Sequence, residues 1–177
     1  MTRLKALDRG DATISPTAAE LLDGLAARGR EPGPMVQTMA NAPALLRGYL
    51  DLNRAMKRAH LDRRITERIS LAAQEWIGCD YCLAAHTEAA RGLGLSEVDI
   101  ELARQGTAAE PAVAAIVAFG QQVLAAPAEI GDEDVERLRE HGYSDEQIAE
   151  VVGLVALNLL TGSFNLVAGL HPAEVAA

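Results

Sequence analysis

Two cysteines and a histidine lie close together in one segment of this 177-residue sequence. Cys79 and Cys82 are separated by two residues, and His86 follows Cys82 by four. Side chains three and four residues apart share one face of a helix, so a helix here brings both thiols and the imidazole together. An adjacent imidazole can take the proton of a thiol or hold the thiolate as an ion pair. The spacing therefore predicts a nucleophilic thiol with a base and a second thiol beside it.

The residues around this pair favour ionisation of Cys82. Gly78 interrupts one predicted helix and Asp80 is expected to cap the next, which puts Cys82 in the first helical turn. Unsatisfied N–H groups and the positive end of the helix dipole lie there, so we expect the thiol to ionise below its usual pKa of about 8.5. Attack of this thiolate on an O–O bond gives a sulfenic acid, and Cys79 condenses with it to a disulfide. An external dithiol must then reduce that disulfide.

Other interpretations of the same residues remain open. The two cysteines could be small buried side chains, or they could bind zinc together with His86, although a structural zinc site needs four ligands. The remaining histidines are distant along the chain: His60, His141 and His171. A c-type haem site requires histidine directly after the second cysteine, and Leu83 occupies that position. We therefore expect no metal and no cofactor.

The composition indicates a globular protein that does not bind nucleic acid. Hydrophobic residues make up 49% of the chain and charged residues 23%, while aromatic residues make up only 3%. A core built from alanine and aliphatic side chains suits closely packed helices. The formal net charge is −9, and an acidic surface repels phosphate backbones.

The distribution of apolar residues along the chain predicts the cellular compartment of the protein. The N-terminal residues have no apolar stretch of the kind found in secretory signals. The longest apolar run, residues 151–160, is interrupted by Asn158 and is too short to span a bilayer. We therefore expect a cytoplasmic protein without membrane contact, in which thiols are kept reduced and a cysteine pair serves redox chemistry.

An all-α fold of seven or eight helices must position these residues. Apolar residues recur every three or four positions, and no stretch alternates with the period of a strand. Trp76 and Ile69 are expected on the buried face of one helix. Val98 and Leu102 are expected on the buried face of a short helix that follows Ser96. The other expected helices lie at about 16–28, 44–59, 65–77, 80–92, 110–125, 132–140 and 144–170.

The first 34 residues are expected to be separate from the helical domain that follows. Residues 1–14 look like a loose arm, and Pro16, preceded by a serine, starts the first helix. A break rich in proline and glycine follows at residues 31–34. We therefore expect an N-terminal arm and helix (1–34) and a helical domain (35–177).

The central motifs resemble a known family. Ile65-Thr-Glu67-Arg-Ile-Ser-Leu, Gly78-Cys79-Asp-Tyr-Cys82, His86 and Gly92-Leu-Gly94-Leu-Ser96 are similar to the alkylhydroperoxidase D core of the carboxymuconolactone decarboxylase superfamily. The resemblance covers about residues 36–170. Its signature is a glutamate twelve residues before the cysteine pair and a histidine four residues after it.

This resemblance implies an all-helical homo-oligomer, commonly a trimer or hexamer, that reduces small hydroperoxides. Cys82 would be the attacking thiol, Cys79 the resolving thiol, and Glu67 and His86 a proton relay. A dithiol such as a dihydrolipoyl protein would be the reductant. Tyr81 differs from the family's best-characterised peroxidase, which has histidine there. The alternative is a redox-sensing or disulfide-exchange member without peroxidase activity.

Overall fold

Residues 2–174 are described by the structure, a computed structural model, and over this range the chain forms helices and no strand. This confirms the all-α prediction. The described residues form nine α-helices, more than expected, because α2 has only six residues and is too short to show a period. The helices are α1 (Pro16–Ala26), α2 (Pro34–Met39), α3 (Pro43–Met56), α4 (Arg63–Ile77), α5 (Asp80–Gly92), α6 (Glu97–Arg104), α7 (Pro111–Ala125), α8 (Asp132–Glu140) and α9 (Asp145–Ala168), with short 3₁₀ helices at Pro127–Glu129 and Pro172–Glu174.

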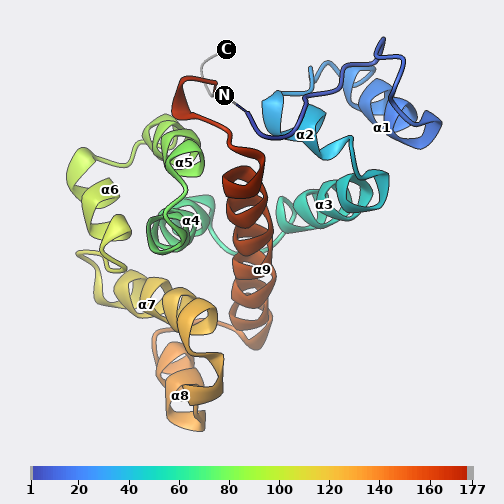
Figure 1. The fold of residues 1–177 in the computed structure, drawn as a ribbon. Helices are drawn as coiled ribbons and strands as arrows, with labels where there is room; N and C mark the ends of the chain where they lie inside the picture. The colour runs from blue at the N-terminus through green and yellow to red at the C-terminus, as the bar shows by residue number, and fades with distance from the viewer. Residues whose placement is uncertain (1, 175–177) are drawn as a thin grey trace.

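Helix α9 runs through the middle of the molecule. Helices α1–α3 lie on one side of it and α4–α7 on the other, while α8 lies near its N-terminal end (Figure 1). Helix α4 approaches α9 closely at Gly162, where an added Cβ would lie 2.6 Å from Oε1 of Gln74. The absence of a side chain at Gly162 therefore allows the two helices to pack at the distance that the site requires.

The chain buries two main groups of apolar side chains around α9. One lies between α4, α7 and α9 and includes Ile69, Val117 and Val151. The other includes Leu22 and Met39 from the N-terminal helices, with partly buried side chains of α9 packed against it. Both faces of α9 thus contribute to the core, which fixes α9 relative to the helices on either side.

The N-terminal arm is not loose, in contrast to the prediction. The backbone N–H of Arg3 donates to the carbonyl of Ala168 at 2.7 Å, and that of Leu7 donates to the carbonyl of Gln37 at 3.0 Å. The side chain of Leu7 is buried. The arm is held by partners far along the chain, which local sequence cannot reveal. A domain boundary after residue 34 stays a prediction.

Two side chains that were expected on buried helix faces are exposed to solvent. Trp76 is 57% exposed and Val98 is 70% exposed. Helix α6 instead buries Ile100 and Ala103. Periodicity marks one face of a helix, but it does not tell how far along that face the neighbouring helices extend.

Among the described residues, α9 is the one helix long and apolar enough to cross a membrane, and it is longer than the interrupted stretch considered above. It packs against α3, α4 and α7 along its length. Its buried residues include Asn158, Gly162 and Asn165. These contacts make α9 part of the packed interior on the faces that it turns to α3, α4 and α7.

Candidate active site

The cysteine pair lies at the junction of α4 and α5. Gly78 ends α4 with a φ of 77°, a conformation that side-chain-bearing residues rarely adopt. Cys79 and Cys82 are joined by a disulfide, with their Cα atoms 5.3 Å apart. The left-handed turn at Gly78 redirects the chain so that Cys79 precedes the first turn of α5, close to Cys82.

The N-cap of α5 is Cys79 and not Asp80, which is the first residue of the helix. The backbone N–H of Cys82 donates to Sγ of Cys79 at 3.3 Å. This follows the usual geometry of an N-cap, whose side chain accepts from the second or third helical N–H. The N-terminus of α5 therefore faces the sulfur of Cys79 more directly than that of Cys82, contrary to the expectation from sequence.

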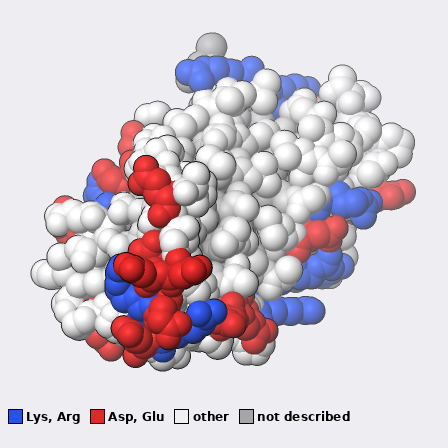
Figure 2. Space-filling model, turned by 90° about the horizontal axis from the view of Figure 1, so that it is seen from below, with Lys and Arg blue, Asp and Glu red and all other residues white. Residues whose placement is uncertain are grey.

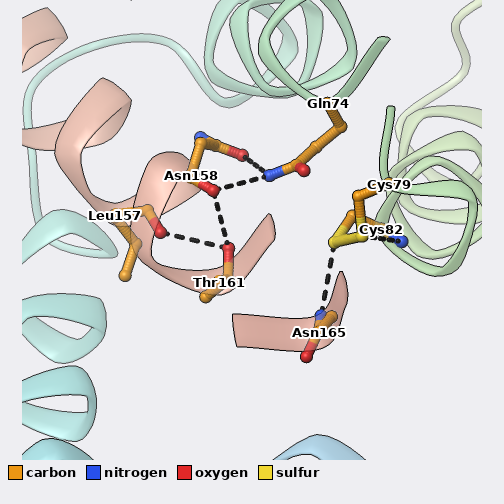
Figure 3. Close-up of a disulfide and its surroundings, with 7 residues drawn as sticks. All are labelled: Gln74, Cys79, Cys82, Leu157, Asn158, Thr161 and Asn165. Carbon is orange, nitrogen blue, oxygen red and sulfur yellow. Dashed lines mark hydrogen bonds between the residues drawn. A yellow bond between two sulfur atoms is a disulfide. The ribbon is translucent and has the colours of Figure 1, made fainter. Parts of the chain in front are cut away.

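The sulfur of Cys82 receives a different donor. Nδ2 of Asn165, on α9, lies 3.3 Å from Sγ of Cys82 (Figure 3). Asn165 is only 2% exposed, and its Oδ1 has no hydrogen-bond donor among residues 2–174. A buried amide aimed at the sulfur stabilises negative charge on it, because hydrogen bonds to ionised acceptors are the stronger ones.

A second buried amide pair holds α9 against α4. Nε2 of Gln74 donates to Oδ1 of Asn158 at 2.8 Å and to its carbonyl at 3.0 Å (Figure 3). Nδ2 of Asn158 donates to Oγ of Ser70 at 3.1 Å. Asn165 lies seven residues after Asn158 and so on the same face of α9. These bonds set the rotation of α9 that points Asn165 at the cysteine pair.

Glu67 and His86 form the second polar element of the site. Oε2 of Glu67, on α4, lies 2.7 Å from Nδ1 of His86, on α5. A neutral imidazole that donates its Nδ1–H to this carboxylate has Nε2 free to accept a proton. His86 lies one turn after Cys82 on α5, so the imidazole can serve that thiol.

A cavity of about 340 Å³ connects these groups. Cys82, Glu67 and His86 all line it, whereas Cys79 does not. The rest of its wall is mixed, and its apolar and aromatic part includes Met35, Tyr49, Met56, Ala59, Leu61, Ala85, Leu154 and Leu157. The structure thus brings together the four residues selected from sequence and makes Cys82 the cysteine that a ligand can reach. Their chemical roles stay predictions.

Both the sequence and the fold are similar to those of known proteins. Residues 43–126 match the carboxymuconolactone decarboxylase family. The fold resembles that of a peroxidase-related protein from Ralstonia eutropha JMP134, described as an alkylhydroperoxidase AhpD core, with a TM-score of 0.79 at 23% identity over 97% of this chain and 92% of that one. The central part of this chain is thus similar in sequence to the carboxymuconolactone decarboxylase family, and the chain shares the fold of this structure.

Two further solved structures have a similar fold. A peroxidase-related protein from Silicibacter sp. TM1040 has a TM-score of 0.78 at 21% identity, covering 99% of this chain and 97% of that one. The debrominase Bmp8, as a cysteine-to-alanine variant in complex with 2,3,4-tribromopyrrole, has a TM-score of 0.75 at 20% identity, covering 99% and 96%. At these identities the likeness establishes the fold.

Burial and charge shift two ionisable groups of the cavity wall. Burial raises the pKa of Tyr49, and the nearby Arg30 acts in the opposite direction. Burial lowers the pKa of Lys57, and the positive charges of Arg30 and Arg63 lower it further, against a smaller effect of Glu67. Several cations therefore lie near the same part of the wall.

A zinc site at the cysteine pair would require the reduced state of both cysteines. The disulfide engages both sulfurs, so neither is a free thiolate ligand. Elsewhere, ligand atoms of His60, Glu146 and Glu150 lie within 4.8 Å of one another at the surface. Oxygens of Glu150 already accept the backbone N–H groups of His60 and Leu61, so this group anchors a loop.

Asn158 and Asn165 are the site residues that sequence reasoning missed. Asn158 was noted only as an interruption of an apolar stretch. Together with Thr161, these amides form a polar row at three- and four-residue spacing within an otherwise apolar helix. Such a row on a buried helix indicates buried hydrogen bonds, and it was a usable signal.

Loss of the Asn165 amide is expected to disfavour the Cys82 thiolate. In a Cys79→Ser background, Asn165→Leu should shift the pH profile of Cys82 alkylation by iodoacetamide upward by about one unit, because a hydrogen bond to a charged group is lost. Asn53→Leu is the matched control, since Asn53 also lines the cavity but donates to the hydroxyl of Tyr49. Equal profiles for the two variants would contradict a role for Asn165.

Proposed function

We propose that this protein is a thiol-dependent peroxidase that reduces organic hydroperoxides through a dithiol–disulfide cycle of Cys79 and Cys82. The observation that carries the proposal is the arrangement of the cavity. One cysteine of a disulfide-forming pair lines it, the other does not, and the Glu67–His86 pair lies in the same wall. These are the parts that a peroxide-reducing thiol requires.

The first step takes place at Cys82 in the reduced protein. Its thiol proton passes to Nε2 of His86, and the thiolate attacks an oxygen of the hydroperoxide. An S–O bond forms as the O–O bond breaks, and the departing alkoxide takes the proton from His86. The products are an alcohol and a sulfenic acid on Cys82, which is oxidised by two electrons.

The second step closes the disulfide and the third reopens it. The Cys79 thiol attacks the sulfenic sulfur of Cys82, and water leaves. An external dithiol, such as a dihydrolipoyl group, then attacks the Cys82 sulfur, which lines the cavity, and releases Cys79. The second thiol of the reductant displaces Cys82 as the reductant closes to its own disulfide. The N–H of Cys82 donates to the Cys79 sulfur, so it stabilises the leaving thiolate and favours its departure.

Reductive debromination is a second candidate for the same site. The likeness of the fold to that of Bmp8 in complex with a brominated pyrrole favours testing it, as does a partly apolar cavity beside a thiol and a proton donor. In that reaction two thiols become a disulfide, the C–Br bond becomes C–H, and bromide leaves. A dithiol–disulfide exchange protein without either activity is the remaining alternative.

Turnover of the wild-type protein tests the proposal. With dihydrolipoamide as reductant, we expect steady consumption of cumene hydroperoxide and formation of the alcohol. The same assay with 2,3,4-tribromopyrrole identifies debromination by bromide release. The peroxidase proposal fails if dihydrolipoamide reduces the disulfide but the reduced protein leaves every hydroperoxide intact.

We also propose that the protein is a cytoplasmic homo-oligomer, a trimer or hexamer. Helix α9 exposes an apolar row at helical spacing, which an interface between subunits would cover: Val152, Leu159, Leu166 and Val167. Sedimentation equilibrium at micromolar concentration is expected to give a multiple of the 18.7 kDa chain mass. Leu159→Glu should lower that mass, and a monomeric wild-type protein would contradict the proposal.

A further inference from the structure

We propose that the cavity takes hydroperoxides that carry a carboxylate on an apolar chain, with the carboxylate held at the cavity mouth by Lys57 and Arg63 and the chain directed toward Cys82. This inference rests on the proposed peroxidase function and names its substrate class.

The cavity adjoins a second hollow. A groove of about 670 Å³ lies between α1, the loop after it and α3. Tyr49, Asn53 and Lys57 line both the groove and the cavity, so these three residues form a shared wall, the junction of the two spaces. Lys57 therefore borders a ligand in either space.

Cations without partners gather at this junction. Lys57 borders both spaces, Arg63 borders the cavity, and Arg30 borders the groove. Within residues 2–174, no carboxylate lies within ion-pairing distance of these three side chains. Burial is the main cause of the lowered pKa of Lys57, and the positive charges of Arg30 and Arg63 lower it further. A carboxylate bound here would supply the missing negative charge.

The chain as a whole is acidic, which makes this accumulation of cations unusual. The formal net charge is −9. In Figure 2, acidic side chains concentrate around the end of the molecule where α8 lies, while much of the rest of that face is uncharged. The groove itself carries Glu20, Glu31 and Asp51. Among residues 2–174, however, Glu31 pairs with Arg9 and Asp51 with Arg54, and no ion pair joins a carboxylate to Lys57, Arg63 or Arg30.

The order of groups along α4 sets the direction of the ligand. Arg63, Glu67 and Ser70 line the cavity from one face of α4, and Ser70 lies about 10 Å further along the axis than Arg63. Glu67 is negative and repels a carboxylate from the inner end. The head group therefore stays near Arg63, and the apolar part lies against the aliphatic wall.

In this arrangement, the residues that bind the carboxylate differ from the residue that reacts with the hydroperoxide. A carboxylate at Lys57 and Arg63 and a hydroperoxide at Cys82 lie at different points of the cavity wall, so a ligand that reaches both needs an apolar chain between its two polar groups. A hydroperoxide of a long-chain unsaturated fatty acid has this form. A small neutral hydroperoxide reaches the same thiol but leaves the cations unpaired.

Binding of decanoate tests the site without chemistry. By isothermal titration calorimetry we expect decanoate to bind about tenfold tighter than decanol, because one charged contact is gained. Lys57→Met and Arg63→Met should each remove most of this preference. Arg58→Met is the matched control, because Arg58 borders the groove but not the cavity and its loss changes the net charge equally.

Turnover separates this inference from the proposed function. Linoleic acid hydroperoxide should have a KM about tenfold below that of its methyl ester, and Lys57→Met should raise only the KM of the acid. Equal binding of decanoate and decanol, or equal effects of Arg58→Met and Lys57→Met, overturns the inference. If the acid preference appears in binding while neither hydroperoxide is consumed, the carboxylate site stands and the peroxidase proposal fails.

Discussion

Cys82→Ser is expected to lose the first turnover of hydroperoxide completely, whereas Cys79→Ser should complete one turnover and stop. Cys82 is the cysteine that lines the cavity, and a serine hydroxyl is far too basic to replace its thiolate. In Cys79→Ser no thiol remains to condense with the sulfenic acid, so Cys82 stays oxidised or over-oxidises. Single-turnover peroxide consumption and intact mass, one oxygen heavier per step, distinguish the two variants.

Serine at position 79 makes this comparison clean. Cys79 caps α5 through its sulfur, and serine is a preferred N-cap residue, so the start of the helix is retained. Cys79→Ala removes the cap as well as the thiol and is the less suitable variant. If Cys82→Ser consumes peroxide and Cys79→Ser does not, the two roles are reversed.

His86→Ala is expected to slow the first oxidation step by roughly 10²–10⁴-fold, because the proton acceptor of the thiol is lost. Glu67→Gln should slow it less, since glutamine still accepts the Nδ1–H of His86 but no longer stabilises a positive imidazole. Stopped-flow measurement of Cys82 oxidation under single-turnover conditions gives the rate of this step alone.

Two controls test whether the slower oxidation of these variants comes from loss of the Glu67–His86 proton relay or from a change in structure. Glu88→Gln removes the same charge as Glu67→Gln, but Glu88 lies at the surface, two residues from His86, where it pairs with Arg91. This variant should leave the rate of Cys82 oxidation unchanged. Added imidazole should restore part of the rate of His86→Ala. A rate for His86→Ala within a few-fold of wild type would remove His86 from the mechanism.

Much of this protein is determined by local sequence. Serine caps at Ser96 and Ser144, and the left-handed glycine at Gly78, place helix ends within a residue or two, because a cap depends only on neighbours within one turn. The helical spacing of Cys82 and His86 put them together for the same reason. The choice of Cys79 over Asp80 as the cap was missed, because either side chain is able to accept the helical N–H.

What only the tertiary structure decided are the contacts between distant segments. Glu67 was selected by resemblance and not by spacing, and it meets His86 because α4 and α5 pack side by side. The donor to Cys82 comes from Asn165, 83 residues away. The exposure of Trp76 and the anchoring of the N-terminal arm likewise depend on which helices lie next to them. Local sequence specifies each helix and its faces, but the free energy that selects partners comes from burial shared among all of them.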